Sequence, residues 1–245
     1  MSVFAGAQVN ADPTKCAVVD TNAIAWEPTG RPGVSMKTLE RFNDPKKGHE
    51  TALVRFEPGA SLPAETLDHR MEIFVVQGTY SDGHGEYGER TFIRNLPGFM
   101  HTPASKEGCV IYWKRRVAIY RNEASWPRLV VDAKTAQWLE FPHRGADVLH
   151  LYRDPNGLET ARIGHVHTGR KIPSHDHSIG EETFVVKGCL TDEYRPYEEG
   201  VWFRMPCGMP HAPYTGDRRC MMLIREGDLV WYVEESTEEG KCSGS

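Results

Sequence analysis

The chain has 245 residues, a formal net charge of −5 and 26% charged residues of both signs. A chain of this length can form one large domain or two smaller ones with a substantial core. The absence of a basic excess argues against nucleic-acid binding, and the longest apolar runs, such as residues 110–113, are far too short to cross a bilayer. The first 15 residues lack a basic start followed by an apolar core, so we expect a cytoplasmic protein.

In chain order, residues 1–22 are small, polar and unpatterned, and we expect a loose N-terminal extension. From residue 23 onward the chain consists of short β-type runs separated by Gly, Pro, Asp and Asn, with almost no helical periodicity. This spacing predicts an all-β barrel or jelly roll. The one candidate helix covers residues 133–138, at the junction between two units, and a simple linker is the alternative for this segment.

The chain repeats itself at an interval of 110 residues. Residues 59–103 aligned on residues 169–213 without a gap give 14 identities over 45 positions, which indicates internal duplication. The interval from Trp26 to Gly33 recurs from Trp138 to Gly145 and marks the start of each unit. We therefore predict a first barrel over residues 23–131, a second over residues 132–236, and a flexible tail over residues 237–245.

Two motifs in the second unit predict a metal site. Residues 169–188 read G-x5-H-x-H-x3-E-x6-G, and residues 200–211 read G-x5-P-x-G-x2-H. The candidate ligands are His175, His177, Glu181 and His211. Side chains two positions apart on an extended backbone share a face, and the turn residues Pro206 and Gly208 can return the last histidine to the same point. Such donors suit iron, manganese, nickel, copper or zinc.

The first unit does not retain this ligand set. Its corresponding residues are Glu65, Leu67, Met71 and His101. Leucine cannot bind a hard divalent ion, so we expect a structural role for this barrel. A looser site made by Glu65, His69 and His101 is the open alternative.

A second H-x-H pair, His165 and His167, precedes the ligand motif. Its counterparts in the first unit are Arg55 and Glu57, which favours a polar lining or an outward-facing position over coordination.

Five further residues flank the ligands and could either contact a substrate or pack in the core: Tyr194, Tyr197, Trp202, Arg204 and Tyr214. The six cysteines form no C-x-x-C pair, which favours reduced thiols, and Cys207 lies four residues before His211.

Together with the Gly-Ala-Ser-Leu-Pro stretch at residues 59–63 and the Glu-Gly-Cys turn at residues 107–109, these motifs resemble the ChrR-like branch of the cupins over roughly residues 24–233. The resemblance implies a bicupin with two tandem RmlC-like jelly-roll barrels. It also implies that the four candidate ligands bind a divalent metal inside the second barrel. Thr215 stands where the family usually has an asparagine, and this position is not a ligand.

Relatives that the chain resembles include acetylacetone-cleaving dioxygenases, whereas the namesake is the zinc-binding part of an anti-sigma factor. Fe(II) favours a dioxygenase, because an octahedral ion keeps two positions open. Zn(II) with four protein ligands favours a sensor or ligand-binding protein without turnover. The roughly 20 residues before Trp26 are too few for a helical sigma-binding domain, so direct anti-sigma action is not expected.

We expect a small-molecule substrate or ligand, and no nucleic-acid or membrane partner. An unpaired barrel edge also allows a homo-oligomer. The sequence assigns no general acid or base.

Overall fold

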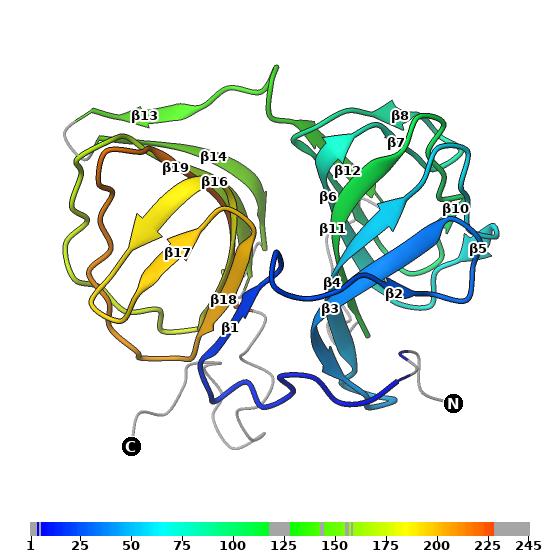
Figure 1. Cartoon of the computed structure of the whole chain (residues 1–245), viewed down its shortest axis with the longest axis horizontal. Coiled ribbons are helices and arrows are strands. Elements are labelled where there is room, and N and C mark those ends of the chain that lie inside the picture. Colours follow the sequence, from blue (N-terminus) through cyan, green and yellow to red (C-terminus); the bar gives the residue numbers. More distant parts are fainter. Residues whose placement is uncertain are drawn as a thin grey trace. The chain divides into compact units, whose positions relative to one another are not determined.

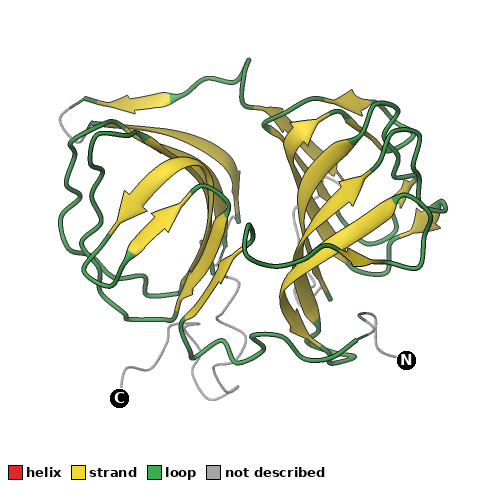
Figure 2. Cartoon of the chain, in the orientation of Figure 1, coloured by secondary structure: helices red, strands yellow, loops and turns green. Residues whose placement is uncertain are grey.

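The computed structural model of the chain describes residue 4, residues 6–117, 128–142 and 145–154, residue 157, and residues 159–227. The described residues form strands and loops and no helix (Figure 2), so the all-β prediction is confirmed. In that part of the chain, no helix is long and apolar enough to span a membrane. The predicted tail at residues 237–245 lies outside the described residues.

The structure divides into two compact units, and Figure 1 shows the strands of each unit curling around an interior. The first unit is built on a seven-stranded sheet with the order β12-β9-β6-β11-β4-β3-β2, and two strand pairs, β10-β5 and β7-β8, complete it. Its strands are β2 (Glu27–Pro28), β3 (Val34–Phe42), β4 (His49–Phe56), β5 (Glu65–Thr66), β6 (Arg70–Gly78), β7 (Tyr80–Ser81), β8 (Glu86–Tyr87), β9 (Thr91–Asn95), β10 (Met100–His101), β11 (Cys109–Arg116) and β12 (Arg128–Asp132).

The second unit is built on an eight-stranded sheet with the order β1-β18-β16-β19-β15-β14-β13, and β17 pairs with β16. Its strands are β1 (Ala17–Asp20), β13 (Leu139–Phe141), β14 (Ala146–Arg153), β15 (Thr160–Val166), β16 (Glu181–Thr191), β17 (Pro196–Glu198), β18 (Val201–Met205) and β19 (Cys220–Glu226). The paired strands of both sheets are antiparallel, as expected for a jelly roll.

The first strand of each repeat belongs to the sheet of the other repeat. β1, which begins the first repeat, pairs with β18 of the second unit. β12, which begins the second repeat, pairs with β9 of the first unit. Buried Arg204 reinforces the first pairing, because its guanidinium donates hydrogen bonds to the carbonyls of Asp12 and Lys15. Residues 12–23 therefore belong to the second unit, although the sequence predicts that residues 1–22 form a loose extension. The predicted boundary at residue 131 falls inside β12.

Each unit has its own apolar core, formed by alternate residues of its strands. In β18, Val201, Phe203 and Met205 point into the core of the second unit. Trp202 and Arg204, on the other face of β18, are also buried, because β18 is covered on both sides. In the first unit, Leu67 and Met71 are part of the core.

The predicted helix at residues 133–138 is wrong. Residues 133–135 form a turn in which the Asp132 carbonyl accepts hydrogen bonds from the Thr135 amide at 3.2 Å and from the Ala136 amide at 2.9 Å. Six residues are too few for a stable helix without further packing.

We predict that Gly188→Ala destabilises the protein more than Gly169→Ala. Both glycines have a positive φ, of 87° and 66°, so alanine costs about 1–2 kcal/mol at either position. At Gly188 the added Cβ would also collide with the Arg219 carbonyl, whereas at Gly169 it would meet open space. Chemical denaturation of the two variants measures the difference, and equal free energies of unfolding would contradict the prediction.

Candidate metal centre

A pair of backbone hydrogen bonds brings two of the candidate ligands together. The His175 amide donates to the His211 carbonyl at 3.0 Å, and the His211 amide donates to the His175 carbonyl at 2.9 Å. The predicted turn before His211 is present, with Gly208 at a φ of 72° and its amide bonded to the His177 carbonyl. The two motifs, whose histidines 175 and 211 are 36 positions apart in the chain, therefore meet at one place.

The imidazoles of His175, His177 and His211 converge. The ring of His175 lies 4.7 Å from that of His211 and 5.0 Å from that of His177, measured between centroids. The Nε2 atoms of His177 and His211 are 3.2 Å apart. The three rings offer ligand atoms that all lie within 4.8 Å of one another.

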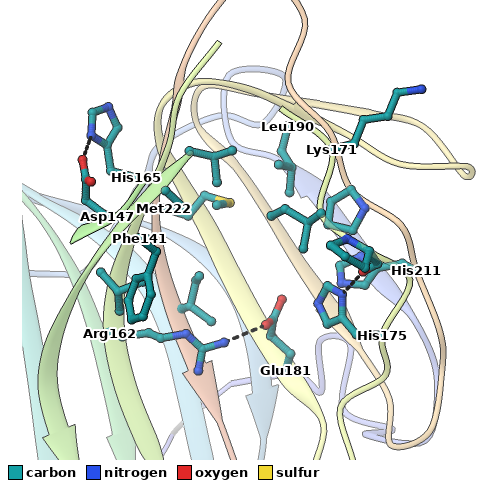
Figure 3. Close-up of a pocket in the computed structure, with 18 of the residues that line it drawn as sticks. Phe141, Asp147, Arg162, His165, Lys171, His175, Glu181, Leu190, His211 and Met222 are labelled. Carbon is teal, nitrogen blue, oxygen red and sulfur yellow. Dashed lines mark hydrogen bonds and ion pairs between the residues drawn. The ribbon is translucent and has the colours of Figure 1, made fainter. Parts of the chain in front are cut away.

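Glu181 begins β16 and lies beside this cluster. Its Oε2 is 3.4 Å from His177 Nε2, and its Oε1 accepts a hydrogen bond from the Thr183 hydroxyl at 2.9 Å. Glu181 forms a second overlapping group of potential ligands with His177 and Glu226. Figure 3 shows the Glu181 carboxylate between the Arg162 guanidinium and the imidazoles of His175 and His211.

The donor set fits a divalent transition-metal ion. His177, Glu181 and His211 are buried, and burying so many polar atoms is costly unless they are paired or bind a metal. Two ring nitrogens facing each other at 3.2 Å can share one proton, and a cation between them would satisfy both lone pairs. Imidazole and carboxylate ligands suit iron, zinc and related ions.

The other ring nitrogen of each histidine is held by an acceptor. His175 Nδ1 is 2.9 Å from the Pro173 carbonyl, His177 Nδ1 is 3.0 Å from Glu226 Oε1, and His211 Nδ1 is 3.4 Å from Asp192 Oδ2. Acceptors of this kind set the tautomer and orient Nε2 towards a metal. All three rings are therefore arranged as metal ligands.

Arg162 on β15 completes the charge balance. Its guanidinium forms a two-pronged ion pair with Glu226 and lies 3.6 Å from Glu181 Oε2. The motif analysis missed Arg162, Glu226 and Asp192, because they lie outside the two motifs: Arg162 on β15, Glu226 at the end of β19, and Asp192 directly after β16. Asp192 alone had a sequence indication, since it recurs as Asp82 in the first unit, where it forms an ion pair with Arg128 at 2.6 Å.

The surrounding charges shift the pKa values of this group. Burial disfavours protonation of His177, but the hydrogen bond to Glu226 and the charge of Glu181 outweigh it and raise the pKa of His177. Burial lowers the pKa of His211. Burial also opposes ionisation of Glu226, yet hydrogen bonds from His177 and Arg162 hold its pKa far below the usual range. Glu226 therefore stays anionic at neutral pH and can help to balance a cation.

A cavity of about 740 Å³ opens beside the cluster in the second unit (Figure 3). His175, Glu181 and His211 are part of its wall. Much of the remaining wall is apolar, and its apolar residues are Phe141, Ala146, Val148, Val166, Ile172, Pro173, Leu190, Pro213, Met222 and Ile224. A small organic molecule could therefore reach the candidate ligands from an apolar chamber.

The five aromatic and arginine residues considered for substrate contact do not line this cavity. Tyr197 packs against Phe203 in the core, and Trp202 and Arg204 are fully buried on the other face of β18. Tyr194 and Tyr214 are exposed, at 50% and 40%. Tyr197, Trp202 and Arg204 therefore pack in the core, which was the alternative to substrate contact.

The equivalent place in the first unit has the same backbone arrangement and different side chains. Glu65 on β5 pairs with His101 on β10, as His175 pairs with His211, and Glu65 Oε1 lies 3.1 Å from His101 Nε2. Leu67 and Met71 are buried in the apolar core. The structural role expected for this barrel agrees with that packing.

The looser site expected from Glu65, His69 and His101 is not supported. Within the described residues, these three do not form a group of ligand atoms close enough to share an ion. His69 instead pairs with Asp68 at 2.7 Å and packs edge-on against Phe4.

The expectation of reduced thiols is wrong for one cysteine. Cys207, in the turn before His211, is disulfide-bonded, whereas Cys16, Cys109, Cys189 and Cys220 are free.

Comparison with known families decides the identity. The model of the ChrR cupin-like domain matches residues 14–118 and again residues 127–230. The chain belongs to the ChrR cupin-like family. Its two matched segments confirm the tandem-cupin prediction, and the first begins ahead of β1, which the structure places in the second barrel.

Solved structures share this bicupin fold at low sequence identity. A "putative dioxygenase" from Nostoc punctiforme has a TM-score of 0.71 at 15% identity, covering 95% of this chain and 88% of its own. A glyoxylate-induced protein, also named as putative, from Pseudomonas aeruginosa has a TM-score of 0.71 at 16% identity, covering 91% of both chains. Oxalate decarboxylase from Lactobacillus farciminis has a TM-score of 0.62 at 11% identity, covering 91% of this chain and 87% of its own. Among curated proteins, no sequence match is found.

We predict that His211→Ala abolishes metal retention at this centre, a loss of one equivalent per chain, and that His101→Ala leaves the metal content unchanged. Both histidines are buried and occupy equivalent positions, so the pair controls for the loss of a buried imidazole. Metal content after dialysis, measured by elemental analysis, gives the result. If both variants lost the same amount of metal, the prediction that only the second barrel holds the ion would be wrong.

We also predict that Glu226→Gln weakens metal binding by about 10–100-fold, the usual effect of losing the carboxylate partner of a metal-binding histidine. The amide can still accept a hydrogen bond from His177 but carries no charge. Glu198→Gln is the control, because Glu198 is an exposed carboxylate paired with Arg218. Competition with a chromophoric chelator measures both affinities, and an unchanged affinity for Glu226→Gln would exclude its orienting role.

Proposed function

We propose that the chain is a mononuclear non-haem iron(II) dioxygenase that acts on a small dicarbonyl or similarly oxygenated organic compound. The metal ligands are His175, His177, Glu181 and His211 in the second barrel. The observation that carries this proposal is the position of three of these donors, His175, Glu181 and His211, in the wall of a cavity of about 740 Å³.

Bound iron(II) would supply a Lewis acid with two remaining coordination positions for an oxygenated substrate and dioxygen. The chain's own residues do the rest. Val148, Leu190 and Met222 offer apolar surface for the carbon skeleton of a substrate and limit the access of water. Lys171 lies in the same wall and offers a positive charge to an enolate or carboxylate oxygen.

Glu226 and Asp192 keep the rings of His177 and His211 oriented, so that the ligands need little rearrangement. Arg162 holds Glu226 in place and faces Glu181. Among solved structures of similar fold, the Nostoc punctiforme protein is described as a putative dioxygenase, which supports the choice of reaction class.

The second candidate is a zinc-binding sensor or ligand-binding protein without turnover. The observation that favours it is the number of protein donors, since three imidazoles and one carboxylate can fill a tetrahedral zinc shell. The match to the ChrR cupin-like domain model agrees with this alternative too.

One experiment distinguishes the two functions. Protein prepared without chelators is analysed for metal, then stripped and reloaded with Fe(II) or Zn(II), and oxygen uptake is measured with a panel of diketones and phenolic ketones. We expect substrate-dependent uptake with iron only, lost in His211→Ala and retained in His101→Ala. Stoichiometric zinc that survives dialysis, with no uptake after iron replacement, would overturn the dioxygenase proposal.

A further inference from the structure

A second cluster of potential metal ligands lies on neighbouring strands of the second unit. Asp147 on β14 is directly opposite His165 on β15, and His167 follows the end of β15. Asp147 Oδ2 lies 2.8 Å from His167 Nε2 and 3.4 Å from His165 Nδ1. The two imidazole centroids are 5.3 Å apart. Two ring nitrogens thus gather around one carboxylate oxygen, and the three ligand atoms all lie within 4.8 Å of one another.

This cluster shares no residue with the candidate centre, although Asp147 and His165 are also part of the wall of the same cavity. Val166 belongs to the barrel core, and a Cβ on Gly164 would meet Ile224 and Met222, so alternate positions of β15 face the interior. His165 has the opposite parity and points to the other face. Figure 3 shows the His165 and Asp147 pair well away from His175 and His211.

The ionisation states at neutral pH suit a cation. The hydrogen bond with His167 lowers the pKa of Asp147, which is therefore a carboxylate. Burial lowers the pKa of His165, so its imidazole is neutral and has a lone pair to donate. The side chains are partly exposed, at 24% for Asp147, 18% for His165 and 44% for His167, which leaves room for an ion to enter and keep water ligands.

The first unit provides an internal comparison. The residues at the corresponding register positions are Ser35, opposite Arg55, and Glu57. Arg55 and Glu57 form an ion pair at 3.1 Å, and the Arg55 guanidinium also lies over the ring of Trp26. A fixed arginine excludes a metal cation from that place. The duplicated scaffold therefore has a metal-type donor set in one copy and a charge pair in the other.

We propose that Asp147, His165 and His167 form a second metal site, which takes a zinc-type divalent cation with water in the remaining positions. Two imidazoles and one carboxylate are a donor set that zinc and neighbouring ions accept. The ion would link β14 to the segment after β15 in the second barrel. This site does not depend on the reaction proposed for the barrel.

The test is a Zn²⁺ titration of metal-free, full-length protein by calorimetry, with metal analysis after dialysis. The unmodified chain is expected to bind two equivalents. His165→Arg combined with His167→Glu recreates the pair found in the first unit and is expected to bind one, as is His211→Ala. His150→Asn is the control, because it removes an exposed histidine from β14 outside the cluster, and it should still bind two.

Two equivalents in the His165→Arg, His167→Glu protein would overturn the proposal. A single equivalent in the unmodified chain, lost entirely in His211→Ala, would overturn it as well. Crystals of the unmodified protein soaked in Zn²⁺ give a measurement that needs no variant. An anomalous peak at the zinc edge between Asp147, His165 and His167 supports the site, and no peak there at saturating zinc refutes it. Neither result bears on metal binding or oxygen uptake in the barrel.

Discussion

The two backbone hydrogen bonds between His175 and His211 bring the candidate metal ligands together. They connect a loop that enters β16 with a loop that leaves β18, and so convert two short sequence motifs into one cluster of imidazoles. The first unit makes the equivalent pairing between Glu65 and His101. The duplicated backbone is therefore common to both units, and the side chains alone decide whether a cation can bind.

Burying two histidines and a glutamate beside the half-buried His175 requires compensating charge. The second barrel provides it through Glu226 and Asp192, which face ring nitrogens, and through Arg162, which balances the carboxylates. In the first barrel, Leu67 and Met71 fill the corresponding space with apolar atoms. These apolar side chains remove potential metal ligands from the first barrel and also remove the need for counter-charges. The first barrel is therefore apolar at this place, whereas the second barrel is polar.

The sequence could predict those features whose information is local or repeated. The candidate ligands stand in two compact motifs, and the Gly208 turn that joins them is a short-range feature, so their convergence followed from spacing. Glu226 and Arg162 belong to β19 and β15, whose pairing depends on the complete sheet, and no spacing connects them to the ligands. Likewise, the sequence favoured a polar lining or an outward-facing position for His165 and His167, because the register that places Asp147 opposite His165 depends on the pairing of β14 with β15.

The exchange of the first strands has a consequence for the ancestry and the engineering of the chain. β1 completes the sheet built mostly from the later repeat, and β12 completes the sheet built mostly from the earlier one. If the gene were cut between the repeats, the first half would carry β1, which its own sheet does not use, and the second half would carry β12, which its own sheet does not use. Each sheet would also have an unpaired edge strand where the strand from the other half pairs in the intact chain. Two copies of a single-repeat chain could make the same reciprocal swap, so fusion of a strand-swapped homodimer would account for the present topology without any change in pairing.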